Sequence, residues 1–178
     1  MKPQGQFGNR RGGRRPGREQ GKKEFEQKTI QISRVTRVTG GGKRMRFRAL
    51  VVIGDKKGRV GIGVQKGVDV SEAMNKAVNS AKKSMITVPL HNDTIPHEIK
   101  LKFKSSVVFL KPAKPGTGVI AGGAIRQVLD LVGVKNVLSK MLGSSNKINN
   151  VMATYLALSK MKPRAGFTPK KDAVKATV

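Results

Sequence analysis

Residues 115–146 constrain the fold of this 178-residue chain most, because they join a glycine-rich turn directly to an amphipathic segment. Glycine stands at positions 116, 118, 122 and 123, and apolar residues then recur at helical spacing until Gly133, where such a helix would end. Glycines let a second backbone approach closely, and the free N–H groups at a helix start attract an anion or a carbonyl. The segment therefore predicts a helix over 124–132 behind a turn that can dock another molecule.

The residues before this segment alternate between apolar and polar, as in β-strands. Strands are expected over 30–38, 45–53 and 60–64, with a flexible glycine tip at 40–43 and a second turn at 54–58. A helix should follow, with Ser71 as its N-cap and Glu72 in its first turn. The expected apolar face of this helix comprises Met74, Ala77, Val78, Ala81 and Met85. Three strands and a helix are the core of a double-stranded-RNA-binding domain.

The residues around the glycine-rich segment predict a second unit. Alternation from Ile99 and an apolar run over 107–110 indicate two strands, and residues 137–142 indicate a third after the helix. Residues 143–146 should cap a last helix that Pro163 ends. The apolar face of that helix is expected to contain Ile148, Val151, Met152, Tyr155 and Ser159.

The fold class is therefore α+β, in two small domains. The first is a three-stranded sheet plus helix, like a double-stranded-RNA-binding domain, over 28–93. The second, over 94–164, is of the βαβ type. A Gly/Arg-rich tail at 1–27 has almost no apolar residues and is expected to be disordered, and a basic tail occupies 165–178.

The charge of the chain indicates a polyanionic partner. Its 37 Lys and Arg residues against 10 Asp and Glu give a net charge of +27, and the excess is spread over both expected domains. No apolar run approaches the ~18 residues of a membrane span, and the chain has no cysteine for a disulfide or a thiolate metal site. We expect a cytoplasmic protein that binds nucleic acid and no membrane.

Signals for catalysis are weak. His91 and His97 stand near Asp93 and Glu98 between the domains, where packing is a better interpretation than metal binding or acid–base chemistry. The glycine pairs lack the residues that complete a nucleotide-binding motif. The chain is predicted to be no enzyme, with no cofactor, metal or small-molecule substrate.

Basic side chains gather at two turns and on one helix of the first domain. Arginines 44, 46 and 48 project from one strand face at intervals of ~6.7 Å, a spacing that can follow successive phosphates. The alternative is a solvent-facing strand that uses charge against edge pairing, and for the helical lysines a solvated face is an equally good interpretation. The candidate RNA-binding residues are Arg34, Arg37, Lys43, Arg44, Arg46, Arg48, Lys56, Lys57, Arg59, Lys76 and Lys83.

The mode of binding follows from the aromatic residues. With six Phe, one Tyr and no Trp, the chain lacks the platforms on which RNA bases stack. Phe47, Phe103 and Phe109 stand on apolar strand faces and are predicted to be core. Binding should therefore address the backbone and shape of RNA.

Three blocks resemble the small-subunit ribosomal protein S-five family, bacterial type: the segment at 115–146, GDKKGRVGIG at 54–63 and TIPHE at 94–98. The resemblance extends over about 30–160. It implies a structural constituent of the small ribosomal subunit that binds ribosomal RNA, contacts ribosomal proteins S-four and S-eight and supports translational accuracy. A protein interface is then expected at Gly116, Gly118, Gly122, Gly123 and Arg126.

The other interpretation is a free-standing regulator that binds double-stranded RNA and would not need the glycine-rich segment. The chain also departs from the family at the start of its last helix. Where the family usually reads GSSNPINVVRAT, this chain has Lys147, Asn150 and Met152 in place of a proline, a valine and an arginine.

Overall fold

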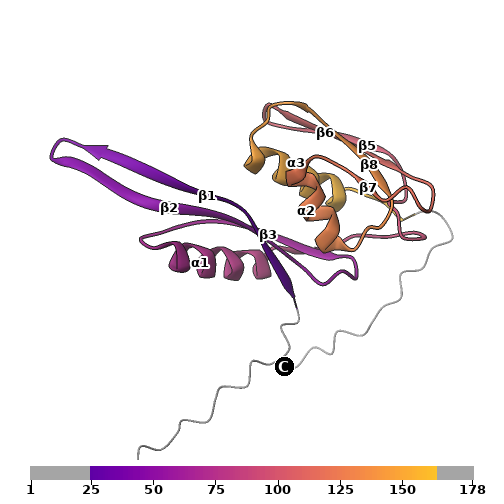
Figure 1. Ribbon diagram of the computed structural model, residues 1–178, viewed down its shortest axis with the longest axis horizontal. Helices are drawn as coiled ribbons and strands as arrows, with labels where there is room; N and C mark the ends of the chain where they lie inside the picture. Colours follow the sequence, from indigo (N-terminus) through magenta and orange to yellow (C-terminus); the bar gives the residue numbers. More distant parts are fainter. Residues whose placement is uncertain (1–24, 164–178) are drawn as a thin grey trace, which may run out of the picture.

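The first half of the chain folds into a four-stranded antiparallel sheet with one helix on it. The computed structural model describes residues 25–163 (Figure 1). The strand order is β1-β2-β3-β4, and the first two strands extend well beyond the helix as a long hairpin (Figure 1). The elements are β1 (Glu26–Thr39), β2 (Gly42–Gly54), β3 (Arg59–Gly67), α1 (Val70–Lys83) and β4 (Met85–Thr87).

The second half forms another four-stranded sheet with two helices. Its order is β5-β6-β8-β7, with β7 and β8 parallel around α2 as a βαβ unit and the other pairs antiparallel. The elements are β5 (Ile99–Phe103), β6 (Ser106–Pro112), β7 (Val119–Ile120), α2 (Gly123–Val132), β8 (Val137–Gly143) and α3 (Lys147–Ser159). The two-domain α+β class expected from the sequence is confirmed. Within residues 25–163 no helix is both long and apolar enough to span a membrane.

Several expected boundaries were wrong. The first strand begins at Glu26, and β4 and β7, of three and two residues, were missed because they are too short to show alternation. Met85 belongs to β4 rather than to the helix. The N-cap of α1 is Asp69 rather than Ser71, and Glu72 accepts a hydrogen bond at 2.8 Å from the backbone N–H of Val68.

The buried face of α3 also differs from the expected one. Of the expected residues only Val151 is fully buried, and Ser159 is exposed. Because α3 lies between the β5–β6 strands and α2, small and polar residues take the closest positions. The buried residues are Asn150, Val151, Ala153, Thr154, Ala157 and Leu158.

The glycines of β3 let α1 lie directly against the sheet. Added Cβ atoms on Gly61 and Gly63 would stand 2.2 and 1.9 Å from the carbonyl oxygens of Ala81 and Ala77. The buried residues of α1 are all alanines, at positions 73, 77 and 81. The GIG sequence of this strand therefore serves close helix packing, which explains why it resembles only part of a nucleotide-binding motif.

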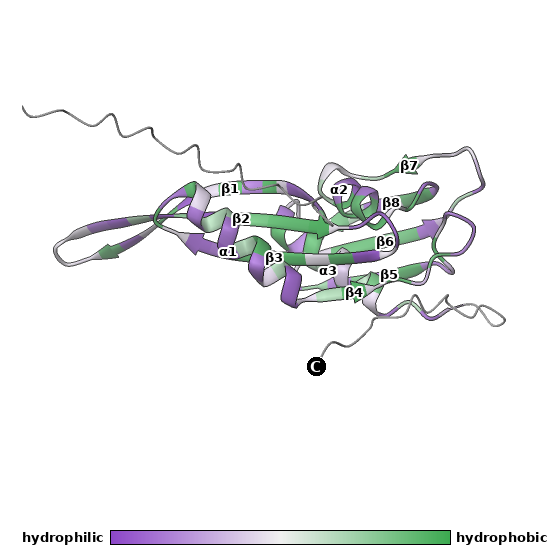
Figure 2. Ribbon diagram, turned by 90° about the horizontal axis from the view of Figure 1, so that it is seen from below, coloured by the Kyte–Doolittle hydropathy of each residue, from purple (hydrophilic) through white to green (hydrophobic). Residues whose placement is uncertain are grey.

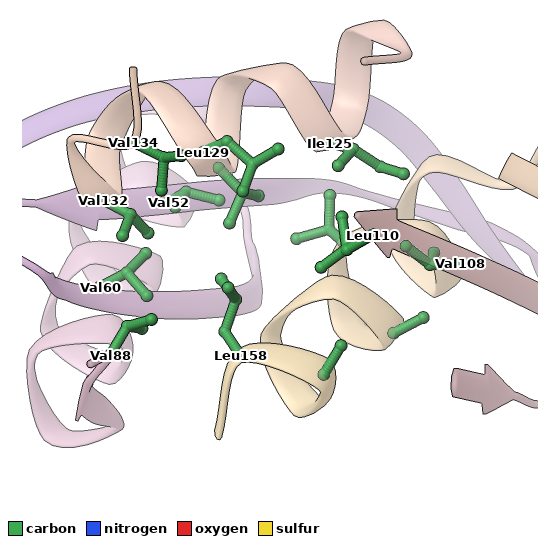
Figure 3. Close-up of a cluster of buried hydrophobic side chains, with 14 of the residues drawn as sticks. Val52, Val60, Val88, Val108, Leu110, Ile125, Leu129, Val132, Val134 and Leu158 are labelled. Atoms are coloured by element: carbon green, nitrogen blue, oxygen red, sulfur yellow. The ribbon is translucent and has the colours of Figure 1, made fainter. Parts of the chain in front are cut away.

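The opposite face of the first sheet joins the two domains in one core. Val52 and Val60 on this face belong to the same buried cluster as Leu129 of α2 and Leu158 of α3 (Figure 3). Leu50 of the same face also belongs to this cluster. Figure 2 shows hydrophobic stretches in β2 and β3 beside the second domain, whose helices α2 and α3 make the contacts with the first sheet. The Tyr155 hydroxyl of α3 crosses it and donates to the Ser84 carbonyl at 2.8 Å, and burial raises the pKa of Tyr155, which keeps the donor protonated.

Backbone hydrogen bonds reinforce the junction. The turn between β2 and β3 lies against the last residues of α2, where the N–H of Lys56 donates to Leu131 at 3.0 Å and that of Gly58 to Val132 at 2.9 Å. These carbonyls have no partner within their own helix. Gly133 ends α2 in the left-handed conformation, with φ of 92°, and an added Cβ there would stand 2.3 Å from the Lys56 carbonyl oxygen.

A one-residue bulge in β1 changes which of its side chains face the junction. The pairing with β2 shifts between Thr29 and Gln31, so Ile30 is the extra residue. Before the bulge Lys28 faces α2 and pairs with Asp130, whereas beyond it the odd-numbered residues from Ser33 onward share that face.

Replacing Gly63 by alanine should destabilise the protein by about 1–3 kcal/mol, because the new methyl group collides with the backbone of α1. Gly41→Ala is the matched control, since an added Cβ there meets nothing within 4 Å, and its effect should stay within about 0.5 kcal/mol. Urea unfolding of both variants checks this, and equal destabilisation would show that helix packing is not the cause.

Candidate nucleic-acid interface

One face of the hairpin carries a continuous set of basic side chains. Arg44 pairs across the strands with Arg37, and Arg48 pairs with both Ser33 on β1 and Lys66 on β3. Because paired residues share a face and alternate residues along a strand do too, these cations project to one side. We call this set the arginine face; it consists of Arg37, Arg44, Arg46, Arg48 and Lys66.

The arginine face lies on the side of the sheet that α1 does not cover. Ala49 and Val51, the neighbours of opposite parity, pack on α1. A groove of about 230 Å³ runs between β1 and β2, lined by Val35, Thr36, Arg37, Arg44, Arg46 and Lys66. Within residues 25–163 none of the five cations forms an ion pair. Their charge is available to an external anion.

Lys66 was missed by sequence reasoning. It follows an apolar strand by itself, and only the register of β3 against Arg48 places it beside the arginines. Conversely, Arg34 pairs with Phe47 and Lys43 with Val38, which puts both on the α1 side of the hairpin. The structure therefore brings together four of the six candidate residues of this hairpin and separates two.

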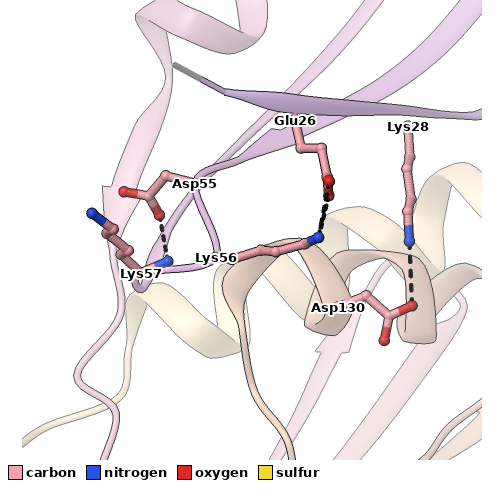
Figure 4. Close-up of polar contacts among 6 residues, drawn as sticks. All are labelled: Glu26, Lys28, Asp55, Lys56, Lys57 and Asp130. Carbon is pink, nitrogen blue, oxygen red and sulfur yellow. Dashed lines mark hydrogen bonds and ion pairs between the residues drawn. The ribbon is translucent and has the colours of Figure 1, made fainter. Parts of the chain in front are cut away.

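The basic residues of the second turn form contacts within the molecule (Figure 4). Lys56 forms an ion pair with Glu26 at 2.9 Å, and the Arg59 Nε lies 2.6 Å from Asp55. Arg59 also stacks over the ring of Phe25, 5.3 Å from its centroid. Only Lys57 leaves its side chain exposed without an ion pair in the described part of the chain. The charges of Lys56 and Arg59 are therefore partly neutralised within the molecule.

The lysines of α1 lie on the other side of the sheet from the arginine face. Lys76 forms an ion pair with Glu72 one helical turn earlier, while Lys83 is exposed at the end of the helix. A single straight RNA helix lying on the arginine face cannot reach them at the same time.

The glycine-rich turn is open at three of its four glycines. Added Cβ atoms at Gly116, Gly118 and Gly123 would meet nothing within 4 Å, whereas one at Gly122 would collide with Met141. The Asn136 side chain holds the turn, because its Oδ1 accepts from the N–H groups of Gly116 and Gly118, both at 3.1 Å. Sequence reasoning missed Asn136, which stands some twenty residues away with no motif around it.

Arg126 lies exposed in the first turn of α2, close to this open surface, and forms no ion pair within residues 25–163. The two histidines lie in the segment between the domains, where His91 pairs with Thr94 through the backbone. Among the described residues no three acidic or histidine side chains gather in a way that could hold a metal ion.

Comparisons with known proteins agree along most of the chain. Residues 25–89 match the family model "Ribosomal protein S5, N-terminal domain", and residues 101–166 match "Ribosomal protein S5, C-terminal domain". "Small ribosomal subunit protein uS5" of Treponema pallidum is 51% identical over 139 residues, 78% of this chain and 81% of the relative. The Thermotoga neapolitana protein of the same name is 49% identical over 139 residues, 78% of each chain. "Small ribosomal subunit protein uS5c" of Emiliania huxleyi is 50% identical over 140 residues, 78% of this chain and 88% of the relative.

Asp55 gives the second turn a pH-dependent stability. Burial alone would raise the pKa of its carboxyl, but hydrogen bonds from the Arg59 guanidinium and from the N–H groups of Lys57 and Arg59 outweigh burial and hold the pKa below its ordinary 3.8. A carboxyl with a lowered pKa in the folded state stabilises the protein above its unfolded-state value, and this contribution is lost as the pH falls through the folded-state value.

Asp55→Asn should therefore lower the free energy of unfolding by about 1–3 kcal/mol at pH 7, and its difference from the parent should shrink as the pH falls below about 4. Asp93→Asn is the control: it removes an ion pair between exposed side chains and should cost less than about 1 kcal/mol. Denaturant unfolding from pH 3 to 7 measures both. A cost for Asp55→Asn that did not change with pH would rule out the carboxylate as its source.

Proposed function

Because the chain belongs to the ribosomal protein S5 family, we propose that it binds small-subunit ribosomal RNA through the arginine face and supports accurate decoding. Family membership makes it a structural constituent of the small ribosomal subunit, located in the cytoplasmic ribosome, rather than an enzyme. The observation that carries the RNA proposal is the set of five cations on one side of the first sheet, without an acidic partner in the described part of the chain.

The binding mode is contact with phosphates. Alternate residues of a strand stand ~6.7 Å apart, so Arg44, Arg46 and Arg48 can meet successive phosphates of one RNA strand. Phe47 packs towards α1 and Phe103 packs against the main core, so neither is available to stack on bases. Phe109, predicted to be core, is instead half-buried and belongs to neither core cluster. Affinity should then depend strongly on salt and weakly on base identity.

The reach of the hairpin fits this role. Its outer part, at residues 36–44, extends away from both α1 and the second domain (Figure 1). Such a projection can enter a space between RNA segments while the second domain rests against other components of the subunit. We propose that the hairpin tip reaches towards the head of the subunit and restrains its motion relative to the body.

The protein partners of this proposal are ribosomal proteins S-four and S-eight. The open turn at Gly116, Gly118 and Gly123 offers a flat backbone surface, and Arg126 beside it can meet a carboxylate across an interface. A neighbour held there would limit the motions that accompany tRNA selection. Gly122 contributes indirectly, because its lack of a side chain makes room for Met141.

Replacing Arg44, Arg46 and Arg48 together by glutamine tests the arginine face. If six to eight cations of the chain neutralise phosphates, a plot of log affinity for small-subunit ribosomal RNA against log salt concentration should have a slope of about −5 to −7. In the variant this slope should be smaller in magnitude by about 3. A triple Lys→Gln variant at Lys100, Lys102 and Lys140, exposed on the second domain, removes the same charge and should keep most of the slope. Equal losses in filter binding would mean that net charge, and not this face, drives binding.

Substitutions in the glycine turn should raise misreading. Gly118→Glu places a bulky charge on the open surface, and Arg126→Ala removes the bridging cation; stop-codon readthrough should rise in both. Because Gly118 has φ of 75°, Gly118→Asn is the control for backbone strain, since asparagine tolerates this conformation best after glycine. Readthrough reporters in cells with normal subunit assembly give the measurement. Unchanged accuracy in the Glu and Ala variants would contradict the docking role.

A further inference from the structure

A cavity of about 220 Å³ lies where the first turns of α2 and α3 meet β1 and β8. It is separate from the groove of the arginine face but opens in the region of the bulge residue Ile30. Its size is below the ~300 Å³ of pockets for drug-sized ligands. The residues that matter for its chemistry are Gly123, Ala124, Gln127, Lys147 and Asn150.

Two buried acceptor atoms of this cavity have no hydrogen-bond partner within residues 25–163: Asn150 Oδ1 and Gln127 Oε1. Asn150 is 0% exposed, and its Nδ2 donates to the Ser144 carbonyl at 3.0 Å, which fixes the orientation of the amide. Native proteins seldom leave buried acceptors without a donor, because the lost hydrogen bonds to water cost free energy. Both oxygens therefore lack a hydrogen-bond donor, which a group that enters the cavity can supply.

The charges around the cavity favour an anion. Gly122, the N-cap of α2, provides no side-chain hydrogen bond, and an added Cβ on Gly123 would meet nothing within 4 Å, so this helix start is open. Lys147 is the first residue of α3, where a cation opposes the helix dipole, and it forms no ion pair in the described part of the chain. An anion between the two helix starts would accept hydrogen bonds from the free N–H groups of α2 and would neutralise the charge of Lys147. A cationic side chain from a partner would be repelled by both positive groups.

We propose that this cavity binds one sugar–phosphate unit of RNA. The phosphate would be held by the N–H groups of Gly123 and Ala124 and by the ammonium of Lys147. A 2′-hydroxyl next to that phosphate would donate to Asn150 Oδ1 or Gln127 Oε1. The inference rests on the RNA-binding function proposed above and deepens it, because a 2′-hydroxyl contact distinguishes RNA from DNA whereas the arginine face addresses phosphates alone.

Two residues of this cavity stand where the sequence departs from the family pattern described above. Lys147 and Asn150 are two of the three positions at which the start of the last helix departs from the usual family sequence, and both line the same cavity. The family residues at these positions, proline and valine, also give natural control substitutions. Proline suits the first position of a helix, and valine removes a buried acceptor that lacks a partner.

The test is a two-dimensional amide NMR titration of the full chain with three probes: uridine 3′-monophosphate, its 2′-deoxy analogue and inorganic phosphate. The signals of Gly123, Ala124 and the Asn150 side chain should shift. The ribonucleotide should bind about three- to tenfold more tightly than the deoxynucleotide, because this ratio corresponds to the net free energy of one hydrogen bond. Asn150→Val and Gln127→Met should each reduce that ratio without weakening the deoxynucleotide, and Lys147→Gln should weaken all three probes.

Two results would overturn the inference: no shifts at these residues, or equal affinities for the ribo and deoxy probes in the parent protein. Asn150→Val also loses the hydrogen bond to the Ser144 carbonyl, so its free energy of unfolding should fall by no more than about 1.5 kcal/mol; thermal unfolding measures this and separates a lost contact from a damaged fold. The salt slope of Asn150→Val on ribosomal RNA should stay within one unit of the parent slope. The arginine-face variant tests the proposed function itself, so either idea can fail without the other.

Discussion

The hydrogen bonds from the β2–β3 turn to the end of α2 are the interaction on which the arrangement of the two domains depends. Lys56 and Gly58 donate to helix carbonyls that would otherwise need water, at a site that the domains bury between them. Asp55 shapes the turn from inside, and Gly54 and Gly133 admit the close backbone approach. With this joint in place, one side of the first sheet is divided between the second domain and the arginine face.

Much of the architecture follows from local patterns in the sequence. Alternation predicts the long hairpin, Gly133 predicts the end of α2, and Asn146 caps α3 through its Oδ1 as expected. What local patterns cannot give is the partner of each element. The face of α3 was misjudged because its closest positions hold polar and small residues such as Asn150 and Ala153, whose burial depends on α2 and the strands beside them.

The sequence predicts that a basic RNA-binding site exists, but it predicts only some of the residues that form it. A run of alternating arginines is visible in the sequence, but the sheet register decides that Lys66 joins them and that Arg34 and Lys43 do not. Lys56 and Arg59 resemble surface charges until the fold brings Glu26, Asp55 and Phe25 to them. Asn136 holds the glycine turn by accepting hydrogen bonds from Gly116 and Gly118, but it is too far from them in the sequence for a local motif to reveal it.

The bulge at Ile30 changes, within a single strand, whether even-numbered or odd-numbered residues face a given side of the sheet. On one side of it, β1 turns its even-numbered residues towards the second domain; on the other, the odd-numbered ones, including Arg37, take that direction. If β1 and β2 instead paired regularly, with Ile30 opposite a residue of β2, one half of β1 would shift by one residue and turn its side chains to the other face. Either the strand would present Lys28 to the alanines of α1, or it would exchange Arg37 for Val38 in the basic groove. A single bulged residue thus keeps Lys28 at the interdomain contact and Arg37 on the charged surface, both on the same side of one continuous strand.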